Sequence, residues 1–404
     1  DRLINTLNKT NIAIIGGGAS ALLLACSLDK TRFHVSIYEK NTALGRKFLV
    51  AGKGGFNLTH SEEQTSFANR YYTKDLVEPF LKHFSNADLR NWLKETGIET
   101  YVGTSKRVFP VQGIKPIAVL NAIEKRLSEN TVSIHYNHTW TGWHNDQLQF
   151  LVNDKTVLVK ADVVVFALGG ASWKVTGSDG SWRDYFNEKG IQTNDFYPSN
   201  CAFKINWDKA LAKIISGQAL KNCEFKCGKA GKKGEAVLTD FGIEGSGVYA
   251  LSTKIREQLK ALGKAGLNVD FKPQISKEEI KNRIETRGRL SLKDVLEKKI
   301  GLSPVQIQLI KNASSKEEYN DAEFLSGLVK SYPLTISGLA PVDDAISTVG
   351  GIDLNEINSS LELKKLPNHY CMGEMLDWDA PTGGYLLQAC FSMGSYLGDK
   401  LNKL

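Results

Sequence analysis

The clearest pattern near the start of the chain is an apolar run that leads directly into glycines. Residues 11–15 read NIAII, three glycines follow, and a second apolar stretch continues to residue 28. Residues 34–40, HVSIYEK, then alternate between polar and apolar positions. This order predicts a strand, a glycine turn, a helix and a second strand, which together form one βαβ unit over residues 11–40.

A second buried strand is predicted over residues 161–170, ADVVVFALGG, because an uninterrupted apolar run suits a parallel strand that is covered on both faces. Between the two strands, residues 76–96 and 116–130 have helical periodicity. Residues 132–158 alternate as antiparallel strands do. We assign this whole region to one domain.

The composition changes near residue 196, where short strand-like pieces give way to helical segments rich in Lys and Glu. Such a shift marks an inserted unit, and a chain of 404 residues is long enough for more than one core. The predicted parts are the first part of a nucleotide-binding domain at 1–195, an inserted β-rich domain at 196–275, a helical subdomain at 276–332, and a return strand with the second part of the nucleotide-binding domain at 333–404.

Composition narrows the class of protein. Hydrophobic residues make up 42% of the chain, and no apolar run approaches the roughly 18 residues that a membrane span needs. Because no signal-peptide core is found either, we expect a cytoplasmic protein without a membrane partner. The six cysteines are scattered and no histidine pair accompanies them, which predicts free thiols and no metal site.

The net charge of +7 does not by itself indicate nucleic acid. The lysines are spread over helical segments such as 254–264 and 293–299, as is typical of solvated faces. We therefore predict no nucleic-acid partner. The excess positive charge would attract anions, including a pyrophosphate or a carboxylate.

Gly16, Gly18 and Ala21 form a GxGxxA motif at the predicted junction of strand and helix. In this motif the first glycine permits a tight turn and the second lets the backbone approach a pyrophosphate. The helix N-terminus, at Ala19 and Ser20, supplies N–H donors. A glycine turn that binds nothing is the alternative.

Glu39, followed by Lys40, ends the second strand about 20 residues after the glycines, where an acidic residue binds a ribose diol. An acidic residue at this position favours an adenosine with a free 2′-hydroxyl, as in FAD or NAD.

The next segment distinguishes FAD from NAD. FAD binds in an extended form, so its ribityl chain and ring need backbone donors beyond the first turn, whereas a nicotinamide dehydrogenase has no need for a second glycine-rich loop. Such a loop follows here, and from it we predict cofactor contacts by Gly52, Gly54, Asn57 and Thr59. Arg46 and Lys47 are predicted to serve the pyrophosphate, with plain surface cations as the alternative.

The C-terminal segment supplies the other half of the predicted site. Gly373 and Glu374 follow a short strand, and Asp377 is placed to bind ribityl hydroxyls. A helix then begins at Gly383 and Gly384, and its N-terminus can stabilise negative charge on the N1–C2=O edge of a flavin. The remaining predicted cofactor-binding residues are Trp140, Ala167, Gly169, Gly170 and Tyr385.

The sequence resembles the BaiN/YhiN-like family of NAD(P)/FAD-dependent oxidoreductases over nearly its whole length. The matching stretches include GGGASA, LGRKFLVAGKGGFNLTH, KRVFPVQGIKP, VVFALGGASW, LTDFGIEGSGVYALS and GEMLDWDAPTGGYLLQACFSMG. The resemblance implies an α/β, Rossmann-type two-dinucleotide-binding-domain flavoprotein fold, with an inserted β-barrel and a helical subdomain. One branch of the family resembles enone reductases that act on bile-acid intermediates. Many members carry Arg-Cys-Asn where this chain has Gly55-Phe56-Asn57, so no role of that arginine or cysteine carries over.

Gly245, Gly247 and Ala250 form a second GxGxxA motif, followed by a predicted helix and a strand that ends near Asp270. Alone, this motif is typical of a nicotinamide-dinucleotide site. We favour a helix-capping turn, because the resemblance places the segment in the insert.

Catalytic residues are harder to predict, since no Ser-His-Asp order or metal cluster is present in the sequence. The polar candidates near a flavin are Lys53, Asn57, Tyr249 and Glu374, and each is equally well explained as a loop-stabilising residue. We expect an FAD-dependent oxidoreductase that acts on a small molecule, such as an unsaturated carbonyl compound, with NAD(P)H as a transient electron donor. The alternative is a flavin-bearing binding or regulatory protein without turnover. The sequence specifies neither the substrate nor the oligomeric state.

Overall fold

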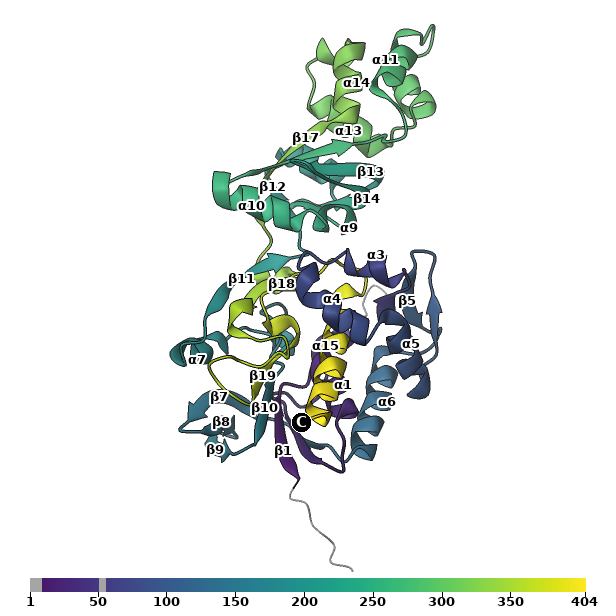
Figure 1. Cartoon of the computed structure of the whole chain (residues 1–404). Helices are drawn as coiled ribbons and strands as arrows, with labels where there is room; N and C mark the ends of the chain where they lie inside the picture. The colour runs from purple at the N-terminus through teal and green to yellow at the C-terminus, as the bar shows by residue number, and fades with distance from the viewer. Residues whose placement is uncertain (1–8, 51–55) are drawn as a thin grey trace, which may run out of the picture. The chain divides into compact units, whose positions relative to one another are not determined.

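A computed structural model describes residues 9–50 and 56–404 of the chain (Figure 1). The chain divides into two compact units. The first combines the N-terminal part, up to Tyr197, with Ser347–Leu404, and the second is Pro198–Ile346. The two ends of the chain therefore build the same unit.

A five-stranded parallel sheet forms the centre of the first unit. In spatial order its strands are β19 (His369–Cys371), β10 (Val163–Phe166), β1 (Thr10–Ile15), β2 (Phe33–Tyr38) and β6 (Ser133–His135). All four residues of β10 are buried, which explains its uninterrupted apolar run. Strand β19 pairs with β10, with Tyr370 opposite Val165, so a segment from the far end of the chain completes the sheet.

Two helices from opposite ends of the chain pack against each other beside this sheet (Figure 1). They are α1 (Ala19–Ser27) and α15 (Tyr385–Asn402). A β-carbon built on Gly394 would lie 2.3 Å from the backbone oxygen of Ser20 and 3.1 Å from the backbone nitrogen of Leu24. Glycine at this position thus lets the two backbones come into contact.

Smaller elements complete the first unit. The strands β3 (Thr59–His60), β5 (Arg107–Pro110) and β4 (Thr100–Val102) form one antiparallel sheet, and β7 (Thr139–His144), β8 (Gln147–Val152) and β9 (Lys155–Val159) form another. Strands β11 (Thr193–Ser199) and β18 (Ser347–Ile352) form a two-stranded sheet. The further helices are α2 (Arg46–Val50), α3 (Gln64–Ala68), α4 (Lys74–His83), α5 (Asn86–Glu95), α6 (Pro116–Glu129), α7 (Arg183–Glu188), and the short η2 (Lys174–Thr176), η6 (Leu354–Glu356) and η7 (Gly373–Met375).

The single helix predicted over residues 76–96 is in fact two helices, α4 and α5. Ser85 accepts a hydrogen bond from the backbone N–H of Asp88, and the Asp88 side chain accepts one from the backbone N–H of Ser85. This capping box starts α5 and separates it from α4.

The second unit is built around a closed barrel. Its strands, in order around the barrel, are β12 (Phe203–Ile205), β15 (Gly242–Glu244), β14 (Ala230–Leu238), β13 (Ala219–Cys227), β16 (Ala265–Asp270) and β17 (Tyr332–Leu339). The helices of this unit are α8 (Lys209–Ile215), α9 (Ser246–Tyr249), α10 (Ser252–Leu262), α11 (Lys277–Glu285), α12 (Leu292–Asp294), the π-helical η3 (Val295–Lys299), α13 (Pro304–Asn312), η4 (Glu318–Asn320), α14 (Ala322–Lys330) and η5 (Val342–Asp344). The predicted return strand is β17, which closes the barrel between β12 and β16. The predicted fold class, a Rossmann-type unit with an inserted barrel, is confirmed.

The second GxGxxA motif lies in this barrel. Its strand, β15, pairs antiparallel with β12 and β14, so the motif is not part of a parallel βαβ unit. Gly245 has a φ of +118° and precedes α9. A β-carbon on Gly247 would lie 2.8 Å from the backbone oxygen of Glu235. The geometry agrees with a capping turn in which glycine packs against the barrel.

In the described part of the chain, no helix combines the length and apolar character needed to cross a membrane.

We expect Gly394→Leu to force α1 and α15 apart, because the new side chain would collide with backbone atoms that cannot move aside. Overpacking typically costs about 1–3 kcal/mol. The free energy of unfolding, measured by urea denaturation, should fall by this amount or more. Gly266→Ala is the control, since a β-carbon there would meet nothing within 4 Å. A Gly394→Leu protein as stable as the control would contradict the close helix contact.

Candidate active site

The turn between β1 and α1 lies at the carboxyl edge of the parallel sheet. Gly16 has a φ of +98°, and its N–H donates to the carbonyl of Tyr38 over 2.8 Å. A β-carbon on Gly16 would lie 2.3 Å from the carbonyl oxygen of Ala167, just after β10. The turn therefore lies against both neighbouring strand ends, at the edge where ligands of such sheets bind.

The N-terminus of α1 is open to a ligand. Gly18 precedes the helix, and no side chain caps it. A β-carbon on Gly18 would meet nothing within 4 Å. Open space thus lies beside Gly18, immediately before the helix that begins at Ala19 and Ser20. This is the arrangement that binds a phosphate.

Glu39 is 8% exposed, lies beside the glycine turn and is hydrogen-bonded to it. Its Oε2 accepts a hydrogen bond from the Gly17 N–H over 2.8 Å. Its Oε1 accepts from the backbone and side-chain nitrogens of Asn41, over 2.8 and 2.7 Å. An ionised carboxylate has about four acceptor positions, so one position is left for a ribose hydroxyl.

The predicted cations near Glu39 are each bonded to another side chain. Lys40 Nζ lies 3.0 Å from Asp179 Oδ2, and Arg46 donates to the side-chain oxygen of Asn41 over 2.9 Å. A β-carbon on Gly177 would lie 2.6 Å from the Asn41 amide, so the loop after β10 packs closely here. Arg46 and Lys40 are thus fixed beside the end of β2.

Lys47 and Glu374 bring the two ends of the chain together in an ion pair. Lys47 Nζ lies 2.6 Å from Glu374 Oε2 and 2.9 Å from Ser172 Oγ. The Glu374 side chain is 8% exposed, and its Oε1 accepts from the Thr348 N–H over 3.3 Å. A β-carbon on Gly170 would lie 2.2 Å from Thr348 Oγ1, so glycine is needed for this approach. Four distant segments therefore meet in one polar cluster.

Asp377 has structural partners. Its Oδ1 accepts from the Gly350 N–H over 2.9 Å, and its Oδ2 accepts from the Asn194 side chain over 2.8 Å. The carboxylate thus ties the segment after β19 to the two-stranded sheet. Its predicted contact with ribityl hydroxyls stays a prediction, and these partners would share the carboxylate with that contact.

The start of α15 packs against the end of the second glycine-rich loop. Gly383 and Gly384 have φ values of +115° and +91°. A β-carbon on Gly384 would lie 2.6 Å from the Thr59 Cα. Thr59 has no exposed surface, and its hydroxyl donates to Gln388 Oε1 over 2.7 Å. Thr59 therefore contributes a helix contact, which the sequence pattern did not reveal.

Sequence reasoning missed a hydrogen-bond network around Tyr385. The Tyr385 hydroxyl donates to Glu62 Oε1 over 2.5 Å, and Arg70 forks onto the same carboxylate with nitrogen–oxygen distances of 2.9–3.2 Å. The His60 ring stacks on Tyr385 with 5.4 Å between centroids. Burial and the Glu62 carboxylate raise the pKa of Tyr385 well above its usual value. No local motif marks these residues, since they meet only in the fold.

The other predicted site residues have different surroundings. Gly169, with φ +73°, accepts a hydrogen bond from the Trp182 ring nitrogen over 3.2 Å. Trp140 is buried among aromatic rings, and its Nε1 has no hydrogen-bond partner among the described residues. The same holds for the buried Oδ1 of Asn57.

Two groups of predicted residues are not among the described residues of the first unit. Tyr249 belongs to the second unit, where burial raises its pKa to about 12. Gly52, Lys53 and Gly54 lie outside the described residues.

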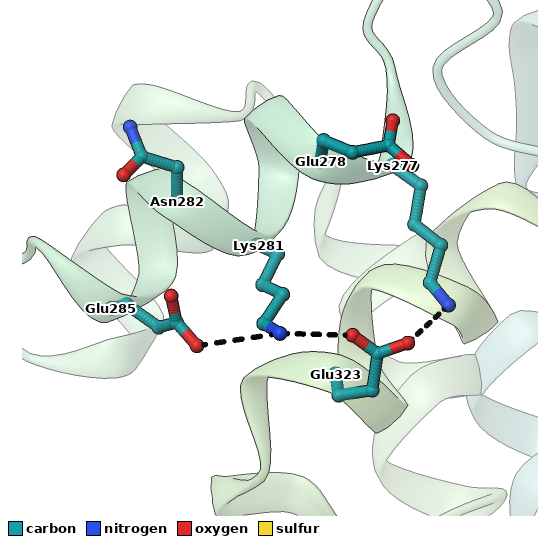
Figure 2. A pocket seen from close by; sticks show the side chains of 6 residues that line it. All are labelled: Lys277, Glu278, Lys281, Asn282, Glu285 and Glu323. Carbon is teal, nitrogen blue, oxygen red and sulfur yellow. Dashed lines mark hydrogen bonds and ion pairs between the residues drawn. The ribbon is translucent and has the colours of Figure 1, made fainter.

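A charged groove in the second unit has a different character (Figure 2). Lys281 Nζ lies 3.1 Å from Glu323 and 3.8 Å from Glu285, and Lys277 also pairs with Glu323. The two pairs with Glu323 link α11 to α14, and such exposed pairs contribute little to stability. Across the described ranges, no group of three or more His, Cys, Asp or Glu side chains is placed to hold a metal ion.

These features together define a flavoprotein of the Rossmann type. The family described as HI0933-like protein Rossmann domain matches residues 10–400. The chain belongs to this family and is an FAD-dependent oxidoreductase. The residues present fit FAD, because the uncapped α1 N-terminus, the open space at Gly18 and the free acceptor position of Glu39 suit its adenosine diphosphate half.

Relatives named for two different reactions span nearly the whole chain. A 3-dehydro-bile acid delta(4,6)-reductase from Clostridium scindens is 25% identical over 418 residues, covering 96% of this chain and 98% of the relative. A ribosomal RNA dihydrouridine synthase from Haemophilus influenzae is 23% identical over 395 residues, covering 94% and 95%.

Solved structures have the same fold. A 3-ketosteroid delta1-dehydrogenase from Sterolibacterium denitrificans has a TM-score of 0.52 and 12% identity, and the match covers 98% of this chain and 100% of that chain. A flavocytochrome c3 fumarate reductase has a TM-score of 0.51 and 14% identity, covering 98% and 78%.

We expect Glu39→Ala to weaken FAD binding by tenfold or more, because hydrogen bonds to a charged group are each worth about 1.5–3 kcal/mol. Fluorescence titration of the apoprotein with FAD measures this. Glu188→Ala, which removes an exposed carboxylate, is the control. Equal affinities in the two variants would refute the ribose assignment.

Lys47→Met should destabilise the protein by about 1–3 kcal/mol, because it leaves the buried Glu374 carboxylate without its cation. Lys47→Met combined with Glu374→Gln should recover part of that loss. Urea unfolding of both single variants and the double variant gives the coupling energy. Strictly additive losses would contradict a direct interaction between the two side chains.

Proposed function

We propose that the protein uses FAD to reduce a C=C bond that is conjugated to a carbonyl group, with NAD(P)H as the electron donor. The observation that supports the proposal is the convergence of the chain's two ends at one edge of the sheet. A β-carbon on Gly373 would lie 2.8 Å from Ser20 Oγ in α1, and Glu374 follows directly. In open sheets of this kind, dinucleotides bind at the carboxyl edge of the strands.

The chain's own residues have separate tasks in this proposal. The α1 N-terminus and Glu39 hold the adenosine diphosphate end, while Lys47, Glu374 and Gly170 border the ribityl chain. The start of α15 borders the flavin ring. When bound, FAD supplies the hydride chemistry at N5 of that ring. The protein then has to orient the substrate and exclude water.

The relatives support a conjugated alkene as the reacting group. The Clostridium scindens relative is named as a reductase of a 3-dehydro bile acid at delta(4,6), which places C=C bonds beside a 3-oxo group. The Haemophilus influenzae relative is named for dihydrouridine, the product of saturating a uracil ring bond that is conjugated to a carbonyl. Both names thus refer to saturation of an alkene that is conjugated to a carbonyl.

RNA is the second candidate substrate, and it departs from the sequence-based expectation of no nucleic-acid partner. Two relatives that cover 94% and 96% of this chain are named ribosomal RNA dihydrouridine synthases. The net charge of +7 is compatible with binding a polyanion. A small unsaturated carbonyl compound and a uridine in RNA share the same reacting bond, so substrate size is what experiment has to decide.

Anaerobic stopped-flow mixing with NADH or NADPH tests the proposal. We expect the flavin absorbance to bleach, and then to return on addition of an enone such as a 3-oxo-4-ene steroid or of unmodified ribosomal RNA. Glu39→Ala is the matched control, with less bound flavin. A flavin that stays oxidised with both donors, and that no enone or RNA reoxidises after photoreduction, would instead indicate a flavin-bearing binding protein without turnover.

A further inference from the structure

Arg107 is a cation of the first unit that has no acidic partner among the described residues. It is half-buried on β5, and no ion pair or side-chain hydrogen bond involves it among the described residues. The nearby Arg70 is neutralised, since its nitrogens bond to Glu62. Removing a cation from water is unfavourable unless an anion or acceptor is near, and the described residues provide no such side chain for Arg107.

Arg107 lies beside the start of α15. Strand β5 pairs with β3, which places Arg107 directly opposite His60. Opposite residues of an antiparallel pair project from the same face, and the His60 ring stacks on Tyr385. A β-carbon on Gly383 would lie 3.7 Å from Arg107 Nε. The guanidinium group is therefore next to the glycines that precede the helix.

The other described groups on this face carry no net positive charge. Burial lowers the pKa of His60 below its usual value, so its ring is neutral at neutral pH. The Tyr385 hydroxyl and Arg70 are both bonded to Glu62. Arg107 thus carries the positive charge of this face.

We propose that Arg107 binds the N1–C2=O edge of the FAD ring and favours negative charge there. The inference rests on the proposed function, which places the flavin ring at the start of α15. Reduction by a hydride adds two electrons and one proton to the ring, so negative charge accumulates at the edge away from N5. An opposite charge within about 4–6 Å favours the charged form roughly tenfold or more.

The test compares the midpoint potential of FAD bound to the full-length protein and to Arg107→Gln, by reductive titration with reference dyes. We expect the variant's equilibrium to shift about tenfold toward oxidised FAD, which lowers the potential of a two-electron couple by about 30 mV. Affinity for sulfite, which reacts with oxidised flavin and is favoured by the same positive charge, should also fall about tenfold.

Two further variants are controls. Lys106→Gln removes an exposed cation next to Arg107 in the chain and should leave the potential unchanged. Arg107→Lys keeps the charge and should retain most of the wild-type potential. An unchanged potential in Arg107→Gln, or an equal shift in Lys106→Gln, would overturn the proposal. An unchanged potential with slower enone reduction would also overturn it and assign Arg107 to the substrate carbonyl.

If Arg107→Gln does not retain FAD, Arg107→His decides the matter, because imidazole gains charge between about pH 8 and 5. The flavin potential should then rise more steeply toward low pH than in the wild type, and equal slopes would overturn the proposal. These measurements need neither NAD(P)H nor an organic substrate. Inactivity toward enones and RNA would therefore refute the proposed function without deciding the role of Arg107.

Discussion

Direct contact between the backbones of α1 and α15 is the constraint on which the first unit depends. Gly394 sits on the Ser20 carbonyl, and Gly398 lies close to the Ser27 side chain, so the C-terminal helix can approach α1 along two turns. Because α15 follows β19 closely in the chain, this contact also fixes where the last strand joins the sheet. Glu374, between the strand and the helix, is thereby brought to Lys47.

Charges around the candidate site are mostly paired inside the protein. Lys40 pairs with Asp179, Lys47 with Glu374, and Arg70 with Glu62. The first two pairs link segments that are far apart in sequence, and each of the three includes a side chain that is at least partly shielded from water. They orient the loops that surround the sheet edge, so a cofactor entering there meets a largely preformed polar surface.

Local features of the sequence were sufficient to predict the βαβ unit, because an apolar run, a glycine turn and an acidic strand end are all contiguous. The buried strand β10 was predictable for the same reason. Partners could not be predicted where they meet only in the fold. The Lys47–Glu374 pair spans 327 positions, and Tyr385 reaches Glu62 across 323. Asp377 has the residue type expected of a ribityl ligand, yet nothing local indicated its bonds to Gly350 and Asn194.

The split first unit has a consequence for synthesis on the ribosome. When β10 emerges, β1 can pair with one of its edges, but the strand for its other edge, β19, is made only after the entire barrel unit. An apolar strand edge is thus left unprotected while the second unit folds, and such edges promote association between chains. Rapid, independent folding of the barrel would shorten that exposure, so the order of translation favours an insert that is stable before its host is complete.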